Sequence, residues 1–337
     1  MGLLYTTDPL FLEHDAGAHH PERPSRLRAV EVGIESSGMQ DDLIRFEAQP
    51  ATAADIQRVH PGSYLGRLEA LNEAGGGHID ADTAMGPRSL SAALLAAGAG
   101  LEAVRRLDAG EGSAAFCAIR PPGHHATPSR AMGFCLINNV AVTARALADR
   151  GERVLIVDYD AHHGNGTQDV FYGDGRVAYL SLHQYPMYPG TGALHDSGDG
   201  EGDGMTVNIP LPAGATGDVY RYAMDQVVLP FTESWAPTWM LVSAGFDAHR
   251  KDPLTDLGLT AGDFADLTRD LAQLVPVGRT VVFLEGGYDL EALRDSVGAS
   301  LAALSAGSFR PEAASADGPG RTAVDNVRRW RDAHGWP

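Results

Sequence analysis

The chain has 337 residues, of which 44% are hydrophobic and 21% are charged, so it can bury a core and is not disordered as a whole. Its formal net charge of -18 at pH 7 disfavours binding to nucleic acid, because phosphate backbones attract basic surfaces. An acidic surface attracts cationic substrates, although solubility is its simpler explanation.

Two cysteines, Cys117 and Cys135, are too few for a disulfide framework and indicate a reducing compartment. Residues 1–12 lack the basic and apolar regions of a signal peptide. No apolar run is long enough to span a bilayer. We therefore expect a soluble, cytoplasmic protein that does not act at a membrane. Nothing in the sequence indicates its oligomeric state.

Short apolar runs alternate along the chain with longer helix-like segments. The predicted strands cover residues 114–119, 153–157, 177–182, 239–243 and 280–284. The predicted helices cover residues 89–107, 138–150, 218–233 and 261–274. This alternation predicts an α/β fold with a parallel sheet and helices on both faces. The strands are apolar without interruption, which fits burial on both sides.

Three further segments complete the chain. Residues 198–204, GDGEGDG, do not lie between a strand and a helix and lack EF-hand spacing, so we interpret them as a surface loop. Residues 305–320 are rich in Ala, Ser, Gly and Pro, which is typical of a flexible connection. Residues 321–333 are predicted to form a terminal helix.

A polar cluster follows each predicted strand. These clusters are residues 120–125, residues 158–166, His183, Asp247 and residues 285–288. In open parallel sheets, ligands bind outside the carboxyl ends of the strands. Residues that are far apart in sequence are therefore expected to converge on one site.

The segment DYDAHHGNGTQ, residues 158–168, is the strongest candidate for a metal site. Asp160 and His162 stand two residues apart at a strand end, so their side chains project to the same side. Asp247 in SAGFDAH also follows an apolar strand and is the natural third ligand. Three protein ligands with one open position would make a catalytic zinc site. The alternative is a strand end capped by solvated carboxylates, and the density of His, Asp and Gly argues against it.

The segment RPPGHHA contributes two adjacent histidines, His124 and His125, after another strand. Histidine titrates in the range needed to take a proton from water and to give one to a leaving amine. Asp158 and Asn165 are available to orient the two rings. On spacing alone, the histidines could instead be metal ligands or belong to a solvated loop.

Glycine-rich turns and aromatic residues complete the candidate site. In LEGGYD, Gly286 permits close approach of the backbone to a ligand, and the Tyr288 hydroxyl could donate to the oxyanion formed from an amide carbonyl. Phe134 and Tyr188 would form a narrow apolar slot for an alkyl chain. Each signal alone has a simpler explanation, either an ordinary turn or core packing.

The motifs RPPGHHA, GFCLINNVA, VLIVDYDAHHGNGTQ, YPGTG, SAGFDAH and LEGGYD occur in an order and spacing that resemble the histone deacetylase family. HPERPSRLRAV and VHPGSYL, nearer the start, are also similar. The family includes bacterial histone-deacetylase-like amidohydrolases and acetylpolyamine amidohydrolases. The resemblance implies a single-domain arginase–deacetylase fold with an eight-stranded parallel sheet flanked by helices. It assigns residues 1–305 to the catalytic domain and residues 306–337 to a C-terminal linker and terminal helix.

The resemblance also implies a role for each matched residue. Asp160, His162 and Asp247 would bind zinc, with iron(II) as an alternative. His124 and His125 would be the tandem catalytic histidines, with His125 the proton shuttle, Asp158 and Asn165 their orienting partners and Tyr288 the residue that polarises the carbonyl. The substrate contacts would be Gly133, Phe134, Tyr188, Leu254 and Gly286. Arg26 resembles an arginine beside an internal exit channel. Structural potassium would bind at Asp158, Asp160, His162, Ser181 and Leu182, and at Phe171, Asp174 and Val177.

The resemblance predicts a zinc-dependent deacylase acting on acetyl-lysine in proteins or peptides. An acetylpolyamine or other small N-acyl-amine amidohydrolase is the alternative. Polyamine deacetylases of this kind can carry a glutamate after the Asp-Pro that follows the third zinc ligand, whereas Leu254 follows Asp252–Pro253 here. A non-catalytic acyl-ligand-binding protein is disfavoured by the intact Tyr288 and histidines. An arginase-like dimanganese hydrolase would need additional carboxylate ligands.

Overall fold

The computed structural model describes residues 2–305 and 307–336, so the predicted boundary at residue 306 lies outside the described residues. Eight parallel strands form one sheet in the order β2-β1-β5-β10-β9-β6-β7-β8. Their bounds are β1 Leu3–Thr6, β2 Leu43–Arg45, β5 Ala115–Cys117, β6 Val154–Asp158, β7 Val177–Gln184, β8 Thr206–Leu211, β9 Trp239–Ala244 and β10 Thr280–Leu284. A short antiparallel pair, β3 (Gly77–His78) and β4 (Ala84–Met85), lies outside this sheet. The predicted fold class is confirmed.

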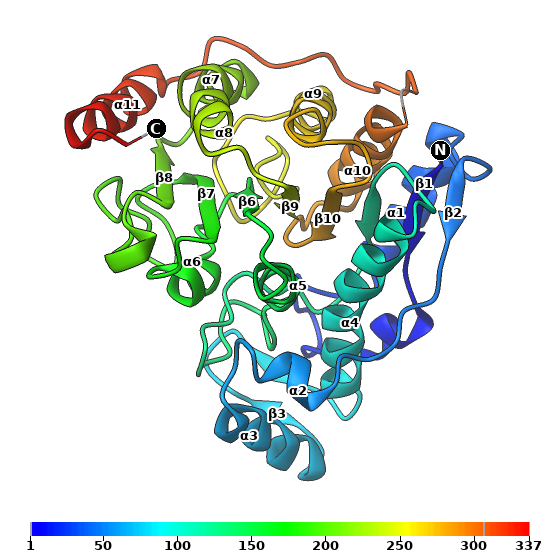
Figure 1. The fold of residues 1–337 in the computed structure, drawn as a ribbon. Helices are drawn as coiled ribbons and strands as arrows, with labels where there is room; N and C mark the ends of the chain where they lie inside the picture. The colour runs from blue at the N-terminus through cyan, green and yellow to red at the C-terminus, as the bar shows by residue number, and fades with distance from the viewer. Residues whose placement is uncertain (1, 306, 337) are drawn as a thin grey trace.

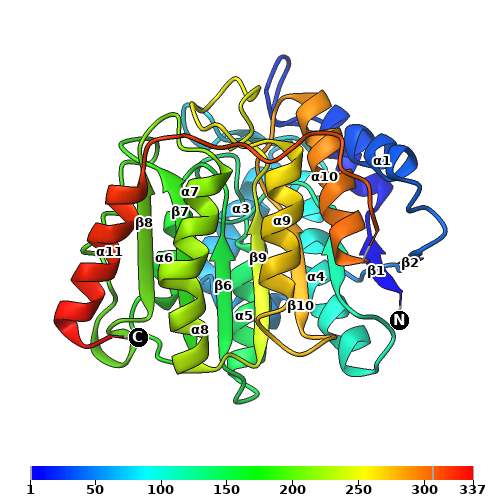
Figure 2. The same cartoon turned by 90° about the horizontal axis from the view of Figure 1, so that it is seen from above.

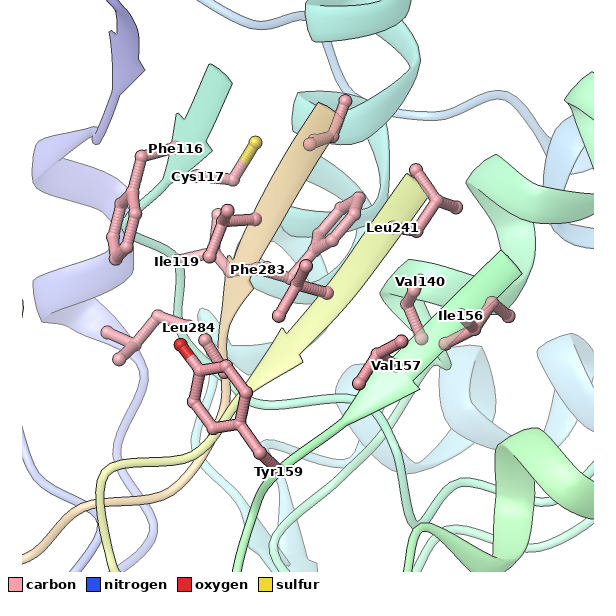
Figure 3. Packing of buried hydrophobic residues seen from close by; sticks show 14 of the residues in the cluster. Phe116, Cys117, Ile119, Val140, Ile156, Val157, Tyr159, Leu241, Phe283 and Leu284 are labelled. Carbon is pink, nitrogen blue, oxygen red and sulfur yellow. The ribbon is translucent and has the colours of Figure 1, made fainter. Parts of the chain in front are cut away.

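The central strands are buried on both faces because helices cover both sides of the sheet. The helices α4 (Ser89–Asp108) and α5 (Asn139–Ala148) lie on one side. The helices α7 (Gly217–Ala223), α8 (Leu229–Trp235), α9 (Ala261–Ala272) and α10 (Leu290–Leu304) lie on the other (Figures 1 and 2). Side chains of β5, β6, β9 and β10, such as Phe116, Val157, Leu241 and Phe283, pack in the core between them (Figure 3). This burial explains the uninterrupted apolar runs in the sequence.

The five predicted strands and four predicted helices all exist, with ends shifted by a few residues. The predicted helix 218–233 is more complex, since a π-helical segment, η3 (Met224–Val228), separates α7 from α8. Pro230 lies in the first turn of α8, where it has no N–H to continue an α-helical ladder. The remaining helices are α1 Ser25–Ser37, α2 Ala53–Ile56, α3 Gly62–Glu73, α6 Asn165–Phe171 and the 3-10 turns η1 Pro9–Glu13 and η2 Gly200–Gly202. The predicted loop 198–204 contains η2 and is otherwise irregular.

Side-chain caps fix the helices that follow the functional loops. Asn138 accepts a hydrogen bond from the backbone N–H of Ala141 at the start of α5, and Asp289 accepts one from Ala292 at the start of α10. Thr260 and Asp263 form a capping box on α9. Each cap satisfies N–H groups that a helix start leaves unpaired.

The C-terminal residues cover one side of the domain. Residues 307–320 contain no helix or strand, and they lead to α11 (Arg321–His334), which confirms the predicted terminal helix. Val324 and Val327 of α11 are buried, and this helix lies beside the edge strand β8 (Figure 2). Among residues 2–305 and 307–336, no helix is long and apolar enough to cross a membrane.

The four central strands, in the order β5-β10-β9-β6, are neighbours in the sheet although they are far apart in sequence. The loop after each of them carries one of the polar motifs. Because all four strands are parallel, their carboxyl ends lie at the same edge, and this edge positions the candidate site.

Candidate active site

Three metal-binding side chains meet at the carboxyl end of the central strands. Asp160 and His162 follow β6, and Asp247 follows the neighbouring strand β9. One donor atom from each residue lies within 4.8 Å of the other two, and all three residues are buried. The Nδ1 atom of His162 lies 3.0 Å from Asp247 Oδ2 and 3.2 Å from Asp160 Oδ1. The structure therefore brings together the residues predicted as zinc ligands.

The charges and donor atoms of this cluster fit a divalent cation. Among the described residues, Asp160 and Asp247 have histidine nitrogens within ion-pairing distance but no lysine or arginine. Burial of two neighbouring carboxylates is costly, and a divalent cation would offset their charge. Two carboxylates and one imidazole also form a donor set that zinc accepts. Iron(II) accepts the same ligand types.

The tandem histidines have different partners. His124 Nδ1 lies 3.0 Å from Asp158 Oδ2, so this nitrogen donates to a carboxylate. His125 Nδ1 lies 2.9 Å from Asn165 Oδ1, so this nitrogen donates to a neutral amide. In both rings, the bond at Nδ1 leaves Nε2 free for the reaction. The predicted orienting residues are thus in hydrogen-bond contact with the predicted histidines.

The pKa values of the two rings are shifted in opposite directions. Burial lowers the pKa of His124, but the negative charges of Asp158 and Asp160 outweigh burial and raise it to about 10. At His125, burial and the positive charge of His124 lower the pKa well below its ordinary value. The neutral amide of Asn165 brings no charge that could offset this lowering of the pKa. A bound cation would add positive charge and lower the basicity of both rings.

A pocket of about 250 Å³ opens at this cluster. Its lining contains all five residues predicted to contact substrate, which are Gly133, Phe134, Tyr188, Leu254 and Gly286, together with His124, His125, His162 and Tyr288. Gly133 has a φ of 56°, and a Cβ there would lie 2.4 Å from the His125 ring. A Cβ at Gly286 would lie 2.3 Å from Asp247 Oδ2. Glycine is therefore required at both positions for the backbone to pass so close to the reactive groups.

Tyr288 is held through its backbone and its ring. Its N–H donates to Asp252 Oδ2 at 2.7 Å, and the ring lies edge-on to Phe134 with centres 5.8 Å apart. The buried Arg26 lies 5.1 Å from the ring centre and donates through Nε to Gly287 O at 2.7 Å. No described residue bonds to the hydroxyl of Tyr288, which leaves that hydroxyl available to a substrate. These contacts place Arg26 beside residues 287–288, and its predicted place at an internal exit channel stays a prediction.

Several residues of the site were not predicted from the sequence. Asp82, Pro122 and Met187 line the pocket, and Asp82 lies in a segment without any recognisable pattern. Glu285 is fully buried and accepts from the backbone N–H of Gly123 at 2.6 Å. A charged residue directly after an apolar strand was the available signal for Glu285.

The residues predicted to bind potassium occupy two places. Ser181 of β7 lies in register with Asp158 of β6, and Leu182 follows it. Phe171 ends α6, Val177 begins β7, and Asp174 lies in the connection between them. The carboxylate of Asp174 already pairs with Arg145 and Arg176, so a cation there would have to bind backbone carbonyls. Potassium binding therefore stays a prediction at both places.

Comparison with known proteins places these features in a family. The Histone deacetylase domain family matches residues 20–304. A probable deacetylase of Archaeoglobus fulgidus is 40% identical over 83% of this chain and 80% of its own length. A histone deacetylase-like amidohydrolase of Pseudomonas aeruginosa is 40% identical over 82% of this chain and 75% of its own. The crystal structure of the HDA15 HD domain has a TM-score of 0.89 and 35% identity, over 97% of this chain and 93% of that chain.

Proposed function

Because the chain belongs to the histone deacetylase family, we propose that it is a zinc-dependent deacylase that hydrolyses the amide of acetyl-lysine in proteins or peptides. The observation that carries the proposal is the convergence of Asp160, His162 and Asp247 beside two oriented histidines and a tyrosine in one pocket. Zinc bound there would act as a Lewis acid and would lower the pKa of a water molecule.

The protein's own residues have separate roles in this reaction. His125 has a neutral orienting partner and a lowered pKa, so we assign to it the removal of a proton from water. His124 is paired with Asp158 and holds its proton more firmly, which suits electrostatic support and donation to the leaving amine. The Tyr288 hydroxyl would donate to the oxyanion as the carbonyl is attacked.

The pocket walls support a straight, mostly apolar acyl-amine chain. Phe134 and Tyr188 would flank that chain, with Gly133 and Gly286 giving backbone access. Leu254 lies in the lining at the place where a glutamate would favour polyamines, and this supports acetyl-lysine. Potassium at the two predicted sites would be structural, since His162 is the one residue of either site that lines the pocket.

Acetylpolyamine hydrolysis is the second candidate, and one observation favours it. Asp82 is a carboxylate in the wall of the pocket. A fixed negative charge attracts a second ammonium group, which polyamines have and a single acetyl-lysine side chain lacks.

The direct test compares rates of zinc-loaded protein on an acetyl-lysine peptide, acetylputrescine and acetylspermidine. We expect turnover of the peptide, inhibition by a hydroxamate and loss of activity on chelation. Faster turnover of the polyamines would replace the first proposal by the second. No turnover of any acyl amide by fully metallated protein would refute both.

A further inference from the structure

Residues 307–320, here called the C-terminal strap, lie beyond the residues that match the family. The strap runs past α10, α9 and α7 to the start of α11 (Figure 2). Its contacts lie near the carboxyl edge of the sheet, where Ser315 Oγ donates to Asp263 Oδ2 at 2.5 Å and Gly318 N–H donates to Thr216 Oγ1 at 2.8 Å. The segment predicted to be a flexible connection is thus anchored at several points.

Glu312 of the strap contacts the loop that follows β9. Its Oε2 atom lies 2.8 Å from His249 Nε2, and its Oε1 atom accepts from Arg250 Nη2 at 2.5 Å. The N–H of Ala261, at the start of α9, donates to Oε2 at 3.0 Å. The N–H of Lys251 donates to His249 Nδ1 at 3.2 Å, so the ring proton resides on Nε2 and points at Glu312. The Glu312 carboxylate therefore accepts hydrogen bonds from the loop and from the start of α9.

The loop that Glu312 contacts, residues 247–254, carries three parts of the candidate site. Asp247 belongs to the metal cluster, and Leu254 lines the pocket. Asp252 accepts from the backbone N–H of Tyr288 at 2.7 Å. His249 lies between these residues in the chain and is buried.

The middle of the loop is also held by backbone contacts and by the ring of Phe264, which stacks on the His249 ring with centres 6.5 Å apart. The backbone of the loop pairs there with Leu259, through the bridge at His249 and the bond from Leu259 N–H to Ala248 O at 3.1 Å. Arg250 N–H donates to Leu259 O at 2.9 Å, and Asp252 N–H donates to His249 O at 2.8 Å. Within the described part of the chain, Glu312 is the one side chain that hydrogen-bonds to the His249 ring, and it comes from outside the loop; the other partner of the ring is the backbone N–H of Lys251.

We propose that Glu312 is a positioning residue, through which the C-terminal strap sets the geometry of loop 247–254 and thereby of the metal ligand Asp247 and the pocket wall at Leu254. This inference rests on the proposed function. The functional part of the protein would then include the C-terminal strap, which lies beyond the residues that match the family and does not line the pocket. Residues that orient metal ligands from outside the ligand set affect metal affinity strongly.

The test compares Glu312→Ala with Arg310→Ala, a matched control on the same strap. Arg310 forms a bidentate pair with Asp266 of α9, at 2.8 Å for each bond, and does not touch loop 247–254. Both variants remove one charged anchor of the strap. We would measure zinc affinity by chelator competition, the visible absorption spectrum of the cobalt-substituted protein, and kcat/KM.

We expect Glu312→Ala to weaken zinc binding about tenfold and to change the cobalt spectrum, while Arg310→Ala matches the wild type in both. If the two variants change metal affinity and spectrum equally, or if neither does, Glu312 is only a structural anchor and the proposal is wrong. Glu312→Gln, which keeps the side-chain volume, replaces the alanine variant if that one does not fold. A wild type that binds zinc but hydrolyses no acyl amide would refute the proposed function, and the comparison of affinities would still decide the role of Glu312.

Discussion

At the scale of single residues, two adjacent histidines acquire different properties from their partners. His124 and His125 share a backbone segment and a buried environment. The carboxylate of Asp158 raises the pKa of His124, whereas Asn165 is neutral, and burial with the positive charge of His124 lowers the pKa of His125. Two adjacent histidines thus differ in how firmly each holds a proton, which is the difference that the proposed division of roles requires.

Replacement of Tyr288 by phenylalanine tests the proposed donor at the substrate carbonyl. The change removes only the hydroxyl, and the residue is not among the metal ligands. Loss of one oxyanion donor lowers kcat by about 100- to 1,000-fold, so we expect that decrease with unchanged zinc content. Steady-state kinetics and metal analysis of the same sample measure both. A variant that loses its zinc, or one that keeps full activity, would contradict the assigned role.

At the scale of elements, Gly98 lets α4 pack against the backbone of residues 49–51 more closely than any residue with a side chain would permit. Gly98 in this helix has no room for a Cβ, which would lie 1.8 Å from Gln49 O and 2.8 Å from Ala51 N. Backbone atoms cannot move aside as a flexible side chain can. The glycine therefore sets the distance between α4 and the segment before α2.

Replacement of Gly98 by alanine should destabilise the fold, although a change from glycine to alanine usually stabilises a helix. We expect Gly98→Ala to lower the free energy of unfolding by about 1–3 kcal/mol through overpacking. Gly66 in α3 has open space around it, and Gly66→Ala should raise the free energy of unfolding by about 0.5–1 kcal/mol. Urea denaturation of both variants gives the comparison. Equal effects of the same sign would show that the contact at Gly98 is unimportant.

At the scale of the whole molecule, buried neutral histidines make the fold sensitive to acid. Asn138 N–H donates to His60 Nε2 at 3.0 Å, and His60 Nδ1 lies 3.2 Å from Pro128 O. Both nitrogens are therefore used in the neutral form, and burial lowers the pKa of His60 from 6.5 to about 4. Protonation at Nε2 would place two N–H groups against each other.

The lowered pKa of His60 predicts that the free energy of unfolding decreases on acidification. Above pH 6.5 the ring is neutral in the folded and unfolded states, so it contributes no pH dependence. Between pH 6.5 and 4 the unfolded chain binds a proton that the folded chain does not, which lowers the free energy of unfolding by about 3 kcal/mol in total. Below pH 4 both states are protonated and the dependence on His60 ends.

His60→Gln should reduce this pH dependence, because glutamine can donate and accept like the neutral ring but does not titrate. Denaturant titrations from pH 7.5 to 4 on the wild type and the variant measure the difference. His78 is exposed, and His78→Gln serves as the control that should keep the wild-type slope. An unchanged slope in His60→Gln would refute the assigned protonation state.

Much of this protein could be predicted from its sequence because the signals are local. Uninterrupted apolar runs such as that of β6 identify strands buried on both faces, and the polar residues that follow them identify the edge of the sheet where the site lies. The two-residue spacing of Asp160 and His162 identifies a metal-binding pair. The strands β1, β2 and β8 were not predicted from pattern. Both β2 and β8 lie at the edges of the sheet, and Asn208 and Pro210 interrupt the apolar run of β8.

Only the tertiary structure decided which distant residues meet. The order β5-β10-β9-β6 brings Asp247 to Asp160 and His162, and no spacing in the sequence encodes that order. The same holds for Asp82 in the pocket wall, for Asp252 behind Tyr288 and for Glu312 beside His249. Local patterns record whether a residue is buried and how the backbone runs, whereas contacts between separate loops depend on how whole elements pack. The sequence by itself determined the residue types of the site and the edge of the sheet that carries it, and the packing of the sheet and the strap decided the arrangement of those residues.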